Sequence, residues 1–259
     1  MPYEAHSELI TPPDETIIWR YLNIAKLLDL FERRVLWFAR VDTFEDPLEG
    51  THTDAEIEYL RSRPNLPAPF PSMEEQYVSM TKMFRQTMFV NCWRSAPSES
   101  MAMWDIYGKG GEVVAIKSTI GRLKESLATH PLNVFIGNVK YVDWGQLSWH
   151  MNALAMVMRK GSSYEHEREV RAVVWGIGPQ GGEPPIVSSS FTDEGRYVFH
   201  GPLGLEIAIE PERLIAEIMI GPREQAMLQK LLGPVLRRYN LEIPVTASDR
   251  LKPRHTDRL

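Results

Sequence analysis

The chain has 259 residues, of which 43% are hydrophobic and 24% charged, and its formal net charge is −5. This composition is typical of a globular protein with a sizeable core, and the negative charge argues against a broadly basic surface for nucleic acid. A single cysteine, Cys92, excludes an intramolecular disulfide and a cysteine-rich zinc site. No stretch approaches 18 consecutive apolar residues, and the acidic N-terminal residues do not resemble a secretory signal. We therefore expect a cytoplasmic protein without a membrane partner.

The first half of the chain predicts strands and helices with a helical excursion at about residues 51–86. The segment 17–22 is rich in β-branched and aromatic residues, as strands are, and Asn23 is a suitable N-cap for the next helix. Four prolines within 64–71 predict a stiff connector inside the excursion. In chain order we expect strands at 17–22, 35–41 and 88–93, and helices at 24–33, 54–63 and 73–85.

The second half mixes short strands and helices without a strict βαβ rhythm, which favours an α+β fold over a doubly wound sheet. We expect one domain over residues 1–259, with a structured core at about 17–247 and a polar tail at 248–259. Its sheet is expected to be mixed or antiparallel, either continuous or split, with flanking helices. The expected helices are 100–107, 120–128, 146–158, 211–214 and 223–239, and the expected strands are 112–117, 134–142, 167–175, 205–209, 216–220 and 243–246.

The richest polar cluster lies at residues 164–171. If a strand begins at Glu167, alternation places Glu167, Glu169 and Arg171 on one face. Neighbouring carboxylates raise each other's pKa, whereas a guanidinium lowers it, so this set is a candidate acid/base or cation-stabilising site. The alternative is that these charges protect an edge strand.

A second candidate is Arg20, which lies inside a strand between Trp19 and Tyr21. A buried arginine requires an anionic partner, and its planar fork fits a carboxylate or a phosphate. The pattern leaves two interpretations open, a ligand contact and an internal salt bridge to Glu167 or Glu169.

The loop at 42–50 is dense in acidic and turn-forming residues. Glu45, Asp46 and Glu49 are oxygen ligands of the kind that divalent cations prefer. The alternative is a capped turn whose carboxylates accept hydrogen bonds from the backbone, and we expect no bound metal there.

Several blocks of the chain occur in an order that is similar to the bacterial domain-of-unknown-function family numbered 2971. The similarity spans roughly residues 17–248 and brings no established activity with it. The blocks are 19–22, 36–40, 42–50, 91–93, 100–108, 164–171 and 220–222.

The same order also resembles, more distantly, the ADP-ribosyltransferases, whose first strand carries Arg or His and whose late strand begins with a catalytic Glu. The resemblance implies that Arg20 holds a phosphate or ribose of NAD, while Tyr21 or Trp19 packs on a ring. It implies that Glu169 stabilises an oxocarbenium-like transition state as nicotinamide leaves, and that Glu167 orients or deprotonates the acceptor. The middle strand differs from the arginine-specific enzymes, because it offers Asn91 and Cys92 in place of a Ser-Thr-Ser sequence.

These observations favour a nucleotide-dependent enzyme that uses NAD as a substrate, either an ADP-ribosyltransferase or an NAD glycohydrolase. An anionic dinucleotide would depend on Arg20 and Arg171 to offset the nearby carboxylates. Two alternatives stay open. One is a non-catalytic ligand- or protein-binding domain in which the charged cluster is structural, and the other is a metal-dependent nucleic-acid-processing enzyme.

Overall fold

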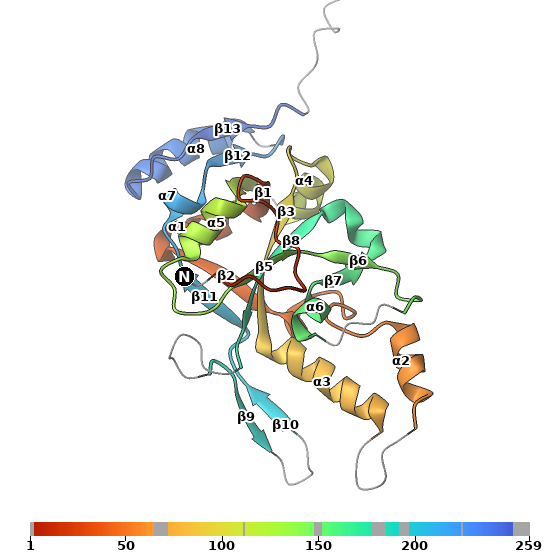
Figure 1. Ribbon diagram of the computed structural model, residues 1–259. Coiled ribbons are helices and arrows are strands. Elements are labelled where there is room, and N and C mark those ends of the chain that lie inside the picture. The colour runs from red at the N-terminus through yellow and green to blue at the C-terminus, as the bar shows by residue number, and fades with distance from the viewer. Residues whose placement is uncertain are drawn as a thin grey trace, which may run out of the picture. The chain divides into compact units, whose positions relative to one another are not determined.

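The computed structural model describes residues 3–64, 72–110, 112–147, 152–177, 185–191, 197–223 and 225–250. The chain forms two compact units, each assembled from three separate segments (Figure 1). Unit 1 contains Met1–Pro12, Trp37–Cys92 and Thr129–Ile207, and unit 2 contains Pro13–Leu36, Trp93–Ala128 and Ala208–Leu259. The single domain expected from the sequence stays a prediction.

Unit 1 contains a mainly antiparallel set of strands in the order β11-β2-β3-β8-β5. The strand β2 pairs with β3 through Ala39 and Val90, and β5 pairs with β8 through Gly137 and Arg171. Strand β8 is buried on both faces and is apolar apart from the charged residues at its start, as doubly covered strands are. The bounds are β2 (Val35–Arg40), β3 (Met88–Ser95), β5 (Phe135–Asn138), β8 (Glu169–Trp175) and β11 (Gly204–Ala208).

The helices of unit 1 begin at well-formed caps. Both α2 (Asp54–Arg61) and α3 (Met73–Thr87) have capping boxes, in which Thr53 pairs with Glu56 and Ser72 with Glu75. These are the two helices that the sequence predicts within 51–86, and most of the expected proline connector, 65–71, lies outside the described residues. The remaining helical segments are η1 (Val41–Thr43), α6 (Ala153–Val157) and η3 (Ser162–Glu167).

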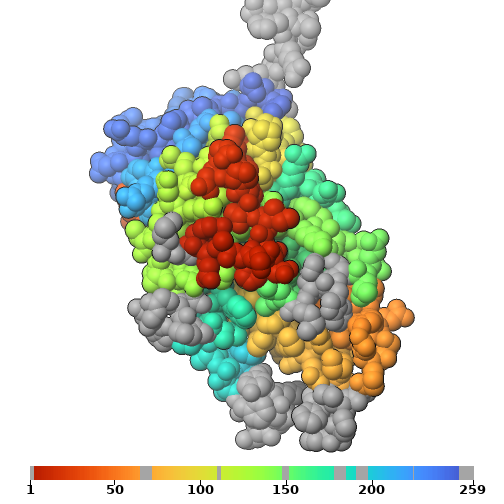
Figure 2. Space-filling model, in the orientation of Figure 1, coloured from red at the N-terminus to blue at the C-terminus, as the bar shows by residue number. Residues whose placement is uncertain are grey.

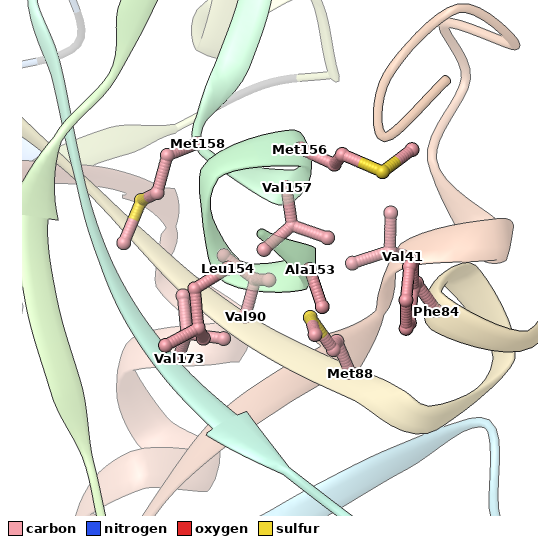
Figure 3. Packing of buried hydrophobic residues seen from close by; sticks show 10 residues of the cluster. All are labelled: Val41, Phe84, Met88, Val90, Ala153, Leu154, Met156, Val157, Met158 and Val173. Carbon is pink, nitrogen blue, oxygen red and sulfur yellow. The ribbon is translucent and has the colours of Figure 1, made fainter. Parts of the chain in front are cut away.

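The core of unit 1 forms where α6 packs against β3, β8 and α3. Figure 3 shows the side chains of α6 surrounded by those of these neighbouring elements. Every residue of α6 is buried, so the described helical part of the amphipathic helix expected at 146–158 has no exposed face. Residues 148–151 of that expected helix lie outside the described residues. The cluster consists of Val41, Phe84, Met88, Val90, Ala153, Leu154, Met156, Val157, Met158 and Val173.

Two small ribbons complete unit 1. The strand expected at 134–142 is divided, because β6 (Lys140–Val142) leaves β5 and pairs in parallel with β7 (Arg159–Gly161). An antiparallel pair, β9 (Ser188–Phe191) and β10 (Tyr197–His200), forms the second ribbon. The N-terminal residues lie at the surface, in red in Figure 2, and Glu4 hydrogen-bonds the backbone of Val134.

Unit 2 contains strands in the order β3-β1-β4-β12-β13, with β1, β4 and β12 antiparallel and β13 parallel to β12. The bounds are β1 (Ile17–Asn23), β4 (Val113–Thr119), β12 (Glu217–Ile220) and β13 (Val245–Ala247). Ser248 is buried and donates its backbone N–H to Ile220, so the polar tail begins later than expected, and 251–259 lie outside the described residues.

The helices of unit 2 include one that the sequence predicts closely. The side chain of Asn23 caps α1 by accepting from the backbone of Lys26, and Arg34 ends the helix in the left-handed conformation. An aromatic cluster, which contains Trp19, Tyr21 and Trp104, is buried beside α4. The helices are α1 (Ile24–Arg33), α4 (Met101–Tyr107), η2 (Gly108–Gly110), α5 (Ile120–Leu127), α7 (Pro211–Leu214) and α8 (Gln225–Arg238).

The α+β class and the mostly antiparallel sheet pairing predicted from the sequence are confirmed. Among the described residues, no helix is long and apolar enough to cross a membrane.

Candidate functional site

A buried ion-pair network occupies the start of β8 in unit 1. Arg171 binds Glu169 through two parallel hydrogen bonds, from Nε to Oε1 at 2.7 Å and from Nη2 to Oε2 at 3.0 Å. Its Nη2 also donates to Glu49, and its Nη1 donates to the carbonyl of Val157 at 2.6 Å. The Arg171 side chain is 1% exposed, so all of these bonds form away from water, where charge-assisted pairs are strongest.

A second cation, Lys160, joins this network to a more exposed carboxylate. Its Nζ lies 2.6 Å from Glu167, 3.3 Å from Glu169 and 3.4 Å from Glu49. The ammonium also lies 4.8 Å from the centre of the Tyr164 ring, a cation–π distance. The Glu167 side chain is 21% exposed and that of Glu169 is 5% exposed. Solvent therefore reaches the network at Glu167.

The network keeps Glu169 ionised. Burial raises the pKa of Glu169, but the charge and hydrogen bonds of Arg171, together with Lys160 and the thiol of Cys92, lower it to about 2. Burial also lowers the pKa of Lys160, but Glu169, Glu49 and Glu167 raise it above its ordinary value. At neutral pH Glu169 is therefore a carboxylate anion that Arg171 and Lys160 hold in place.

The two glutamates expected on one strand face lie on different elements. Strand β8 begins at Glu169, and Glu167 is the last residue of the 3-10 helix η3. Arg168 between them has φ +47°, in the left-handed region, which ends η3 and starts the strand. The expected start of the strand at Glu167 is therefore wrong, although Lys160 brings the carboxylates of Glu167 and Glu169 together.

Arg20 lies in unit 2, on β1, with its guanidinium 5.9 Å from the centre of the Trp93 ring. Trp19 and Tyr21 point to the opposite face of the strand, because neighbouring side chains alternate. Trp19 donates its indole N–H to the carbonyl of Ala96 at 2.9 Å and is 2% exposed. The strand therefore separates Arg20 from these two rings, and the Trp93 ring is the one beside it.

Tyr21 is a buried member of the aromatic cluster. Its hydroxyl accepts a hydrogen bond from the backbone of Ser100 at 2.8 Å, and burial raises its pKa. Its ring meets Trp104 edge-on at 4.8 Å and stacks near Tyr107 at 6.2 Å. Tyr107 is 45% exposed, so it is the solvent-facing ring of this stack.

The acidic loop forms a capped turn and not a group of converging ligands. Asp46 accepts a hydrogen bond from the backbone of Leu48 at 2.9 Å, as the capped-turn interpretation predicts. Glu49 points into the ion-pair network instead, toward Arg171 and Lys160. Across the described ranges, no three His, Cys, Asp or Glu side chains are grouped to hold a metal ion.

Sequence reasoning missed Lys160 and did not place Glu49 in the network. Lys160 is the second of two adjacent bases that directly follow the apolar run 153–158, and both are buried. Two buried cations next to each other require anionic partners, and this is the signal that points to them. The first base, Arg159, binds Glu56 at 2.8 Å, and Glu56 also accepts from His52.

No family model matches the chain, and no curated protein matches it. Solved structures of Thermus sp. 2.9 DarT are similar to it. The complex with ADP-ribosylated ssDNA has a TM-score of 0.39 and 13% identity, over 92% of this chain and 96% of that chain. The complex with NAD+ has a TM-score of 0.38 and 13% identity, over 92% of this chain and 98% of that chain. The complex with carba-NAD+ has a TM-score of 0.36 and 14% identity, over 91% and 96%.

Proposed function

We propose that the protein is an NAD-consuming enzyme, either an ADP-ribosyltransferase or an NAD glycohydrolase. The observation that carries this proposal is the environment of Glu169, a carboxylate held ionised by Arg171 and Lys160 beside the more exposed Glu167. A fixed negative charge in a site of low dielectric stabilises a developing cation more than a solvated negative charge does. Cleavage of the bond between nicotinamide and ribose develops such a cation.

In the proposed reaction the glycosidic C–N bond breaks and its electron pair leaves with neutral nicotinamide. Glu169 stabilises the oxocarbenium-like ribose that remains. The nucleophile, which is water or an acceptor group, bonds to the same carbon and passes its proton to Glu167. Glu167 suits this step because its carboxylate is the one that solvent reaches.

The cofactor-binding residues named from the sequence have distinct proposed roles. Arg20 contacts a phosphate or ribose of NAD, since its fork matches such oxygens. Trp19 and Tyr21 support the strand that carries it, because both rings are buried. Arg171 acts through Glu169, because its N–H groups donate hydrogen bonds to Glu169, Glu49 and the carbonyl of Val157.

The decisive experiment measures nicotinamide release from NAD by wild type and by Glu169→Gln. We expect the wild type to release nicotinamide and the variant to lose at least about 100-fold in rate, since a side chain that acts in the transition state contributes this much or more. Millimolar NAD should also raise the melting temperature of the wild type, because a ligand that binds only the native state stabilises it.

Glu56→Gln is the matched control. Glu56 is also a buried glutamate bonded to an arginine, with a side chain 1% exposed, so its substitution disturbs a comparable ion pair outside the proposed site. The control should lose stability and keep its rate per folded molecule. A wild type that releases no nicotinamide and shows no thermal shift with NAD would refute the proposal.

The burial of the network favours a second candidate function, a ligand- or protein-binding domain without catalysis. Arg171 is fully buried and Glu169 is 5% exposed, as in a structural ion pair. Under this alternative Glu169→Gln unfolds the protein, and the wild type leaves NAD intact.

A further inference from the structure

Strand β7 directs two adjacent cations to two different sets of partners. Neighbouring side chains of a strand point in opposite directions, so Arg159 binds Glu56 while Lys160 binds Glu167 of η3 and Glu169 of β8. The adjacent strand β6 also contacts Glu169, because the hydroxyl of Tyr141 accepts a hydrogen bond from the backbone N–H of Glu169 at 2.7 Å. The β6–β7 ribbon therefore holds both the backbone and the side chain of Glu169.

Lys160 forms ion pairs with Glu167, Glu169 and Glu49, and Arg171 forms ion pairs with Glu169 and Glu49. Three carboxylates thus share two cations. Removing the ammonium would leave three carboxylates around one guanidinium, and such clustered carboxylates bind a proton more readily. The groups around Lys160 are Glu49 from the loop after η1, Tyr164 and Glu167 from η3, Glu169 from β8 and Tyr141 from β6. Arg171 of β8 shares Glu49 and Glu169 with it.

We propose that Lys160 is a positioning residue of the site, whose ammonium group holds the carboxylates of Glu167 and Glu169 together. This role rests on the proposed function, because it matters for catalysis only if the two glutamates act on a substrate. Lys160 itself acts through the glutamates and need not touch NAD.

The test compares Lys160→Met, which removes the charge at similar length, with Lys160→Arg, which keeps it. Lys124→Met is the matched control, because Lys124 forms a 2.7 Å ion pair with Asp14, at the surface of unit 2. Nicotinamide release is measured from pH 3 to 9. In parallel, the carboxyl groups of Glu167 and Glu169 are titrated by carbon-13 NMR, which requires no activity.

In Lys160→Met we expect the carboxyl group of Glu169 to titrate at a pH about one unit or more above its wild-type value. The acid limb of nicotinamide release should move to higher pH in the same direction. Lys160→Arg and Lys124→Met should retain the wild-type acid limb. If Lys160→Met lowers the rate equally at every pH and moves neither titration, the positioning role is refuted.

The double variant Lys160→Met/Glu167→Gln keeps the proposal testable if the single variant does not fold. It leaves two carboxylates with one guanidinium, so we expect it to fold and to be more stable than Lys160→Met, a non-additive effect. A double variant no more stable than the single one would contradict the charge-sharing role. If the wild type does not cleave NAD, the proposed function fails, while the NMR titration still decides the role of Lys160.

Discussion

Glu167 and Glu169 are two residues apart in sequence but lie in different environments. The left-handed conformation of Arg168 ends a helical turn and starts a strand between them, which turns one carboxylate toward solvent and buries the other. Lys160 then brings the two carboxylates together across the site. Sequence alternation places both glutamates on one strand face, which is wrong, because a backbone conformation with positive φ at a non-glycine residue gives no sequence signal.

The ionised state of Glu169 makes stability depend on pH in a defined direction. Its pKa is about 2 in the folded protein against an ordinary value of 4.5. A lowered pKa contributes stability above the unfolded-state value, and this stability is lost as the pH falls from about 4.5 toward 2. We expect Glu169 to account for roughly 3 kcal/mol of the acid destabilisation, as a shift of this size implies.

Urea unfolding of wild type and Glu169→Gln at pH values between 7 and 3 measures this contribution. The variant should be less stable at pH 7, and the difference should shrink as the pH falls. Glu212→Gln serves as the control, since its carboxylate is exposed and pairs with Arg34 at the surface. If the difference in unfolding free energy between wild type and Glu169→Gln stays the same at every pH, the prediction is contradicted.

At the scale of elements, the start of α1 is predicted closely from the sequence. Asn23 caps α1 where the sequence places it, because an Asn side chain satisfies backbone N–H groups at a helix start. By contrast, the strand expected at 134–142 divides into β5 and β6, and these pair with different partners. Short apolar segments carry no information about which strand lies beside them.

The capping box of α2 is linked to a buried ion pair, whereas that of α3 is not. Thr53 is fully buried, and its partner Glu56 also binds Arg159 and His52. We expect Thr53→Ala to cost about 2 kcal/mol and Ser72→Ala, at the more exposed box of α3, about 1 kcal/mol or less. Chemical denaturation of the two variants measures both values, and an equal or reversed order would show that the two boxes act independently of burial.

At the scale of the molecule, each unit has a hydrophobic cluster of its own. The cluster of unit 1 is centred on α6 (Figure 3), and the cluster of unit 2 is built from aromatic side chains of β1 and α4. Segments distant in sequence form each cluster, so the chain crosses between the units repeatedly. Composition indicates that a core of this size is available but does not indicate how it is divided.

The contribution of the unit 1 cluster is measured by Leu154→Ala. Leu154 is 2% exposed within the cluster, and truncating such a side chain typically costs about 2–5 kcal/mol through lost burial and a residual cavity. Leu147→Ala is the matched control, because Leu147 is 55% exposed and its truncation should change stability by less than about 0.5 kcal/mol. Equal effects of the two variants on the unfolding free energy would contradict this account of the core.

The amino-acid sequence predicts the α+β class, most of the helices and the charged clusters, because periodicity, caps and charge runs are local properties of the chain. It identified Glu167, Glu169 and Arg171 and the acidic loop that contains Glu49. Only the tertiary structure decided that Glu49 and Lys160 join them. These two residues are more than 100 positions apart, and the pairing of distant charges depends on how strands and loops pack, which local pattern does not encode. The net charge of −5 likewise gave no sign that two cations are buried among three of the carboxylates.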